Sequence, residues 1–144
     1  MKVKVINRSK NVLPSYETSQ SAGLDVRADI LEPIILKPLE RAMVPTGLYF
    51  ELEPGCEMQV RPRSGLAAKH GITVLNSPGT IDADYRGEVK IILVNLSSDS
   101  YTLNPGERIA QLIVASYQQI QWEECSTLSQ TDRGEGGFGS TGKK

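Results

Sequence analysis

The residues of this sequence that are best suited to chemistry lie in a glycine-rich segment, residues 133–142. Five glycines there surround Arg133, Phe138 and the hydroxyl groups of Ser140 and Thr141. Glycine lets backbone N–H groups approach a ligand closely, and the planar fork of an arginine fits phosphate oxygens. The lone phenylalanine could stack on a flat ring, so the segment is suited to closing over a nucleotide. The alternative is a flexible linker or a frayed terminus.

A second cluster, AGLDVRA at residues 22–28, places Asp25 between apolar neighbours. A carboxylate in such a position needs a cation, a water network or a hydrogen-bonded partner to offset its desolvation. An ion pair with Arg27, or a turn cap, would meet this need without any function.

A third cluster, PRSGLA at residues 62–67, joins Arg63 and Ser64 to a helical turn expected at residues 65–70. The first N–H groups of that turn would add to an anion site. A surface turn is the alternative. A hydrolase pair of Ser64 with His70 is disfavoured because no G-x-S-x-G elbow is present, so we expect His70 to be structural or on the surface.

The richest cluster is NSPGTIDADYRG at residues 76–87, which combines Asn76, Asp82, Asp84 and Tyr85. An asparagine side chain both donates and accepts hydrogen bonds, so it can read the edge of an imide ring. The cluster also carries two carboxylates, and the phenol of Tyr85 could lie against a sugar. A tight β-turn with solvated aspartates is the alternative.

A fifth cluster, residues 105–113, places the amide of Gln111 on an apolar strand. A buried amide needs hydrogen-bond partners. It either satisfies backbone groups only or contacts a phosphate oxygen.

The elements that must position these residues are short apolar runs separated by Gly/Pro turn signals. Such a pattern predicts an all-β sandwich, jelly roll or barrel. The only helix expected is the turn noted above. The expected strands are residues 2–6, 34–37, 42–52, 57–61, 72–75, 88–96, 108–116 and 119–123.

Composition narrows the function classes. The chain has 144 residues, enough for one domain with a real core, and a net charge of −1 without a run of like charges. This balance argues against a nucleic-acid groove or a membrane surface as partner. Cys56 and Cys125 lack metal-ligand spacing, and the first residues alternate like a strand rather than a signal peptide. We therefore expect a reduced, cytoplasmic protein.

All five clusters occur in the order and wording of one known family. The sequence resembles the homotrimeric dUTPases, whose five motifs are matched here by AGLDVRA, PRSGLA, NSPGTIDADYRG, GERIAQLI and RGEGGFGSTG. The resemblance spans nearly the whole chain, and five motifs in order are far more specific than any one of them.

The resemblance implies a jelly-roll-like β-sandwich or barrel with one short helix and a flexible, glycine-rich C-terminal arm. Residues 1–126 would form the nucleotide-binding domain, and residues 127–144 would be the arm. Three chains would form a homotrimer, and each active site would draw on all three. The arm would then act as a lid over a site of another subunit.

The implied reaction is hydrolysis of dUTP to dUMP and pyrophosphate with Mg²⁺ as cofactor. This reaction would limit uracil incorporation into DNA and supply dUMP for thymidylate synthesis. Asp82 would be the general base that deprotonates the water attacking the α-phosphorus. Asp25 would hold Mg²⁺ through bound water. Asp84 is expected to be structural or to contact another subunit.

The resemblance also implies the substrate contacts. Asn76 would read the uracil edge, although some family members use backbone groups there, and Pro78 with Gly79 would leave no room for a 5-methyl group. Tyr85 would exclude a 2′-hydroxyl, and Phe138 would cover the uracil ring. The phosphates would be surrounded by Arg63, Ser64, Gln111, Arg133, Ser140 and Thr141. Further substrate-binding residues would be Gly65, Ile81 and Gly139.

Two rival functions remain at this point. A dCTP deaminase would share the fold and the nucleotide site, but the glutamate and arginine context for attack at C4 of cytosine is not evident. A non-catalytic nucleotide sensor would keep the binding residues, and intact Asp25, Asp82 and Arg133 argue against it. Turnover would separate enzyme from sensor, and the product base would separate hydrolase from deaminase.

Overall fold

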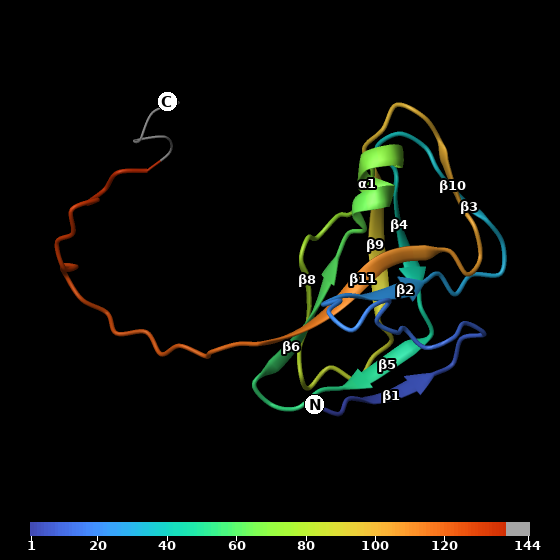
Figure 1. Ribbon diagram of the computed structural model, residues 1–144. Helices are drawn as coiled ribbons and strands as arrows, with labels where there is room; N and C mark the ends of the chain where they lie inside the picture. The colour runs from blue at the N-terminus through green and yellow to red at the C-terminus, as the bar shows by residue number, and fades with distance from the viewer. Residues whose placement is uncertain (138–144) are drawn as a thin grey trace.

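The computed structural model describes residues 1–137, which contain eleven strands and one helix (Figure 1). In chain order the elements are β1 (Lys4–Asn7), β2 (Leu24–Arg27), β3 (Ile34–Leu36), β4 (Arg41–Pro45), β5 (Leu48–Glu51), β6 (Cys56–Arg61), α1 (Ser64–His70), β7 (Ile72–Val74), β8 (Gly79–Ile81), β9 (Lys90–Asn95), β10 (Tyr101–Leu103) and β11 (Arg108–Ser116). The expected fold class, all-β with one short helix, is confirmed.

The strands of the described residues pair into four antiparallel sheets and do not close into a barrel. The largest sheet has the order β2-β11-β6-β8, and a second has the order β4-β9-β7. Two further pairs are β1-β5 and β10-β3. Apolar side chains of the two larger sheets belong to a single buried cluster, which includes Val60 and Leu112 from one and Val44 and Ile91 from the other. This is the jelly-roll-like sandwich that the alternating sequence pattern favours.

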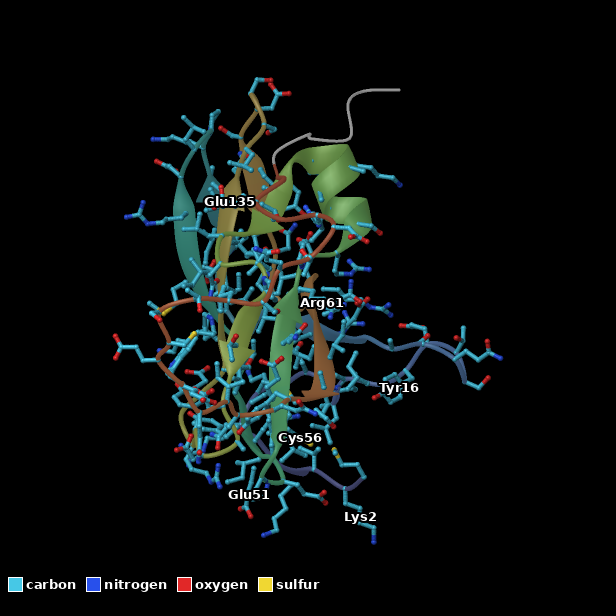
Figure 2. All side chains as sticks on the ribbon, turned by 90° about the vertical axis from the view of Figure 1, so that its left-hand side faces the viewer. Lys2, Tyr16, Glu51, Cys56, Arg61 and Glu135 are labelled. Atoms are coloured by element: carbon cyan, nitrogen blue, oxygen red, sulfur yellow. The ribbon has the colours of Figure 1, made fainter. Side chains whose placement is uncertain are left out.

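Strand β6 shows how the sequence separates core from site. Its residues alternate between buried and more exposed, and Cys56, Met58 and Val60 face the core. Successive strand side chains point to opposite faces, so Arg61 lies on the outer face. Figure 2 shows Arg61 at the end of β6, beside β11. The outer face of this sheet is where the polar residues of the candidate site gather.

Two expectations about strands need correction. The run at residues 42–52 is two strands, because the chain turns at Thr46 and Gly47 between β4 and β5. Gly47 has a φ of 67°, and the Thr46 hydroxyl donates to the Val89 carbonyl at 2.6 Å. The short strands β2, β8 and β10 were not expected. Each has only three or four residues and includes polar ones, so no apolar run marks it.

The strand expected at residues 119–123 is wrong. The last strand ends at Ser116, and the chain then leaves the sheets as an extended segment (Figure 1). Ile120 is 67% exposed and Trp122 is 90% exposed. The alternation of the sequence suits a strand, but a strand also needs a neighbouring edge for its backbone hydrogen bonds. No described strand of the same chain supplies that edge.

Asn95 ends β9 and connects it to β3 and to the loop after β9. It is fully buried, and its amide donates to the carbonyls of Leu36 at 2.8 Å and Asp99 at 2.7 Å. Its side-chain oxygen accepts from the backbone N–H of Ser97 at 2.9 Å.

We predict that Asn95→Ala lowers the free energy of unfolding by about 3 kcal/mol in urea titrations, because it leaves these buried backbone groups without hydrogen-bond partners. Asp99→Ala, which keeps the backbone carbonyl, is the control, and an equal loss there would contradict the prediction.

Candidate active site

An ion-pair cluster surrounds Asp25 on β2. Its Oδ2 lies 3.1 Å from Arg63 Nε and 3.3 Å from Arg108 Nη1. Arg63 also donates to the backbone carbonyl of Arg108 at 3.1 Å, which ties the segment after β6 to β11. The alternative pairing with Arg27 is wrong, since that guanidinium donates to the Gly106 carbonyl at 2.7 Å. The negative charge of Asp25 is therefore balanced by two arginines from two other motifs.

Arg108 is shared between two carboxylates. Its Nη1 also lies 2.5 Å from Oε1 of Glu17, which belongs to the loop between β1 and β2. Tyr16 of the same loop is labelled in Figure 2, where the loop projects from the body of the molecule. Both ion pairs of Asp25 within residues 1–137 use Oδ2. Its Oδ1 is thus left for a hydrogen bond from a ligand or from bound water.

Gln111 lies beside this cluster on the central strand β11. Its Cα partners are Asp25 on β2 and Arg61 on β6, so the three side chains share the outer face. Its Nε2 donates to the Pro62 carbonyl at 3.0 Å. The amide does satisfy a backbone group, as one alternative held, but the second hydrogen on Nε2 remains for a ligand.

Ser64 and Gly65 open helix α1 directly after Arg63, and both are exposed. His70 ends the helix and packs on Tyr101, with ring centroids 5.2 Å apart. Burial, together with the Glu107 carboxylate, raises the pKa of Tyr101 above its usual range. Ser64 and His70 lie at opposite ends of the helix, about 9 Å apart along its axis. His70 is exposed and does not pair with Ser64, in agreement with the expectation that it is a structural or surface residue.

The connection between β7 and β8 presents the second group of candidate residues; β7 pairs with β9 and β8 with β6, so the two strands belong to different sheets. Asn76 is exposed in the turn between them, which the Ser77 hydroxyl closes by donating to the Val74 carbonyl at 2.5 Å. Gly79 is buried against Val60 on β6, and a Cβ added there would lie 3.2 Å from Asn76 Nδ2. Ile81 ends β8 and is partly buried. The close packing at Gly79 holds the turn near the sheet.

Asp82 follows β8 and is exposed. It lines two open clefts, one with Asp84 and Arg86 and the other with Tyr85. The Tyr85 hydroxyl donates to the Glu88 carbonyl at 3.1 Å, and the ring remains 46% exposed. Asp82 and Tyr85 thus share a cleft, whereas Asp84 lines the other cleft, which includes Tyr117 just after β11.

One chain does not bring the two groups of residues together. Asp25 lies on β2 and Asp82 follows β8, and these strands are opposite edges of the same sheet. Asp25 is level with Arg61 on β6, and Asp82 lies one residue beyond Ile81, which is level with Met58. Three strand spacings across the sheet and four residues along it separate the two Cα atoms by roughly 20 Å. Within one chain the two carboxylates therefore lie far apart.

The arm is the third group. Arg133 is exposed and donates to the Gly136 carbonyl at 2.8 Å, within a turn in which Gly134 has a φ of 52°. The segment that carries it lies well away from the sheets (Figure 1). Phe138, Gly139, Ser140 and Thr141, also expected to bind substrate, lie outside the described residues.

Sequence reasoning missed two residues of the Asp25 cluster. Arg108 stands in the fifth cluster of the sequence but was given no role, because only the antiparallel pairing of β11 with β2 carries it to Asp25. Gly23 was likewise unassigned, although a Cβ added there would lie 2.2 Å from Gln111 Oε1. Neither contact has a signal in the local sequence.

Two features that the described residues lack bear on the class of site. Residues 1–137 contain no group of three or more His, Cys, Asp or Glu side chains that could hold a metal by themselves. A divalent ion at Asp25 would therefore need ligands from a substrate and from water, which is how Mg²⁺ is commonly bound. Within the same range, no helix is both long and apolar enough to cross a membrane.

Comparisons with known proteins agree with this geometry. The family model described as dUTPase matches residues 9–142. The deoxyuridine 5′-triphosphate nucleotidohydrolase of Cytophaga hutchinsonii is 58% identical over 141 residues, which cover 98% of this chain and 92% of that protein. The dUTPase of Staphylococcus bacteriophage 80alpha, solved with dUPNHPP, has a TM-score of 0.88 at 26% identity and covers 98% of both chains.

A more distant structure shows the fold alone. The D95N mutant dUTPase of phage phi11 of S. aureus, described with a structural Mg(II) ion, is 20% identical with a TM-score of 0.80 and covers 90% of this chain and all of that one. The match of the family model over most of the sequence, together with a relative 58% identical along nearly its whole length, shows that this chain belongs to the dUTPase family.

Proposed function

We propose that this chain hydrolyses dUTP to dUMP and pyrophosphate, with the residue roles given below. The observation that carries the proposal is the convergence of Asp25, Arg63 and Gln111, from three separate motifs, on the outer face of one sheet. The family membership supplies the reaction class. In the cell the reaction would limit uracil incorporation into DNA and supply dUMP for thymidylate synthesis, and we propose a cytoplasmic location.

We further propose a homotrimer in which each active site is shared. The separation of roughly 20 Å between Asp25 and Asp82 supports this arrangement, since two chains can place both residues on one nucleotide. The exposed segment after β11 supports it as well, because Ile120 and Trp122 alternate like a strand that has no partner among the described residues of its own chain. Residues 127–144 would then close over a site of another subunit, while residues 1–126 form the nucleotide-binding domain.

In the proposed reaction Asp82 accepts a proton from the water that attacks the α-phosphorus. Its exposure in an open cleft leaves its oxygens available for that water. The new bond joins the water oxygen to the α-phosphorus, and the bond to the bridging oxygen breaks to release pyrophosphate. The residues placed around the phosphates are Arg63, Ser64, Gly65 and Gln111 from one chain and Arg133, Ser140 and Thr141 from the arm of another.

Mg²⁺ would be held by the nucleotide phosphates and, through bound water, by Oδ1 of Asp25, and it would offset the negative charge of the triphosphate. The residues present fit this role. Arg63 and Arg108 occupy Oδ2 of Asp25 and hold the carboxylate in place, which leaves the second oxygen to accept hydrogen bonds. Arg63 is thereby positioned beside both the carboxylate and the proposed phosphate site.

Base selection is assigned to the turn that connects β7 to β8. Asn76 would pair with the uracil edge, and the buried Gly79 leaves little space beside it, which supports exclusion of a 5-methyl group. A cytosine amino group would place two donors face to face, a mismatch that discriminates strongly. Tyr85, half exposed beside Asp82, would lie under the deoxyribose. Ile81 would line the same pocket, and Phe138 and Gly139 of the arm would cover the base.

The test is pyrophosphate release from dUTP, dCTP, dTTP and UTP in the presence of Mg²⁺, with chromatographic identification of the nucleotide product. We expect release from dUTP alone, with dUMP as the product. A uracil nucleotide formed from dCTP would indicate a deaminase, and binding of dUTP without turnover would indicate a sensor. Either result would overturn the proposal.

Removal of one charge tests the metal assignment. We predict that Asp25→Asn raises the Mg²⁺ concentration needed for half-maximal activity by about tenfold, because an amide holds the metal-bound waters less strongly than a carboxylate. The measurement is a Mg²⁺ titration of dUTP turnover. Asp99→Asn, on an exposed loop, should leave the titration unchanged. An unchanged Mg²⁺ dependence in Asp25→Asn, with a lower melting temperature, would instead assign Asp25 a structural role.

A further inference from the structure

The side chain of Gln111 lies across the gap between two strands, directly over a glycine. Its Nε2 is anchored to the Pro62 carbonyl at 3.0 Å. At the other end of the same amide, Oε1 occupies the space over Gly23, where a Cβ would lie only 2.2 Å away. Gly23 precedes β2, and Gln111 pairs with Asp25, so the two residues are diagonal neighbours on one sheet face. The Gln111 amide can therefore occupy this position only because residue 23 has no side chain.

The backbone at Gly23 does not itself require glycine. Its φ lies outside the left-handed region, unlike that of Gly47 or Gly71. An alanine can adopt this backbone without strain and would lower the entropy of the unfolded chain. The remaining obstacle is the contact with Gln111, and the nearest atom is the far end of a flexible side chain rather than backbone. An alanine at this position is thus expected to displace the Gln111 amide rather than to unfold the protein.

We propose that Gly23 is a positioning residue that holds Gln111 in the orientation needed to contact the triphosphate. The inference rests on the proposed function, in which Gln111 is a phosphate ligand. With Oε1 seated over Gly23 and one Nε2 hydrogen on Pro62, the second Nε2 hydrogen points in a single direction. A methyl group at residue 23 pushes Oε1 away, breaks the bond to Pro62 and turns that hydrogen from the ligand. Substrate affinity then falls while the fold remains.

A double-mutant cycle tests whether Gly23 affects nucleotide binding through Gln111. Gly23→Ala, Gln111→Ala and the double variant are compared with the unmodified protein by calorimetric titration with dUPNHPP and Mg²⁺, and by thermal unfolding. We expect each single variant to bind the nucleotide on the order of tenfold more weakly, the loss of a hydrogen bond to a charged group. The double variant should bind no more weakly than Gln111→Ala alone, because Gly23 acts only through that side chain.

The results of this cycle either support or overturn the proposed role of Gly23. If the losses multiply in the double variant, or if Gly23→Ala binds normally, the inference is overturned. If Gly23→Ala unfolds at a lower temperature and the double variant regains stability, the contact is supported, since the clash disappears with the Gln111 side chain. Persistent instability in the double variant overturns it. Failure of the proposed function would appear in the unmodified protein itself, as absence of nucleotide binding and of dUTP turnover.

Discussion

Asp82→Asn is expected to lower kcat for dUTP by about 10²- to 10⁴-fold while changing nucleotide affinity little. The amide keeps the size of the side chain but cannot accept the proton of the attacking water. Because Asp82 is exposed and has no salt bridge among the described residues, the change should not disturb the fold. The measurement is steady-state turnover of dUTP together with calorimetric binding of dUPNHPP.

The matched control is Asp84→Asn, two residues further along the same segment. Asp84 lines only the cleft near Tyr117, so its amide variant should retain most of the activity. A loss of nucleotide affinity in Asp82→Asn as large as its loss of turnover would show that Asp82 binds or supports the site instead of acting as base. Equal kinetic losses in the two variants would leave no specific role for Asp82.

Truncation after Asp132, which removes Arg133 and all later residues, is expected to lower kcat/KM for dUTP by about 10²-fold or more. The removed segment contains the arginine, the aromatic ring and the hydroxyls assigned to closure over the nucleotide, and closure of a lid completes a catalytic site. The globular strands end at Ser116, so the truncated chain should keep its fold. Turnover and circular dichroism are the measurements.

Truncation after Gly142 removes only two lysines and is the control. Its activity should match that of the full chain, and sedimentation should report three chains per particle for both truncated forms. Unchanged activity after removal of Arg133 and the residues that follow it would show that this segment is only a flexible linker. A fully active monomer would contradict the proposal that the active sites are shared between subunits.

The two inactive variants together provide a direct test of sharing. Asp82→Asn chains retain the arm, and chains truncated after Asp132 retain Asp82. If each site draws these groups from different subunits, unfolding and refolding a mixture should produce heterotrimers in which some sites contain both. Activity should then rise above that of either variant alone. A mixture without recovered activity would mean that one chain supplies both groups to the same site.

The fold class and the identity of the polar clusters could be read from the sequence because both depend on local pattern. Alternating apolar residues such as Met58 and Val60 predict strands whatever their partners are. The expectation failed where a strand depends on its partner. Residues 119–123 have the alternation but no edge to join within the described part of the chain. Strands β2 and β8 are too short to stand out in the sequence, and they are strands because β11 and β6 lie beside them.

The same division applies to the candidate site. The sequence by itself determined which groups could act, because the chemistry of a carboxylate, an amide or a guanidinium belongs to the residue type. Asp25, Asp82, Gln111 and Arg133 were all found in that way. Which of them meet is a different question, and the tertiary structure decided it. Antiparallel pairing brings Arg63 and Arg108 to Asp25 across long stretches of chain, and sheet order places Asp82 at the opposite edge.

Gly23 shows the physical reason most plainly. In the sequence it is one glycine among 13. In the folded chain it is the open space into which the end of the Gln111 side chain fits. The residue type determines which chemistry a side chain can perform. Contact between residues far apart in the chain depends instead on strand register and strand order, which are set by the packing of the whole core.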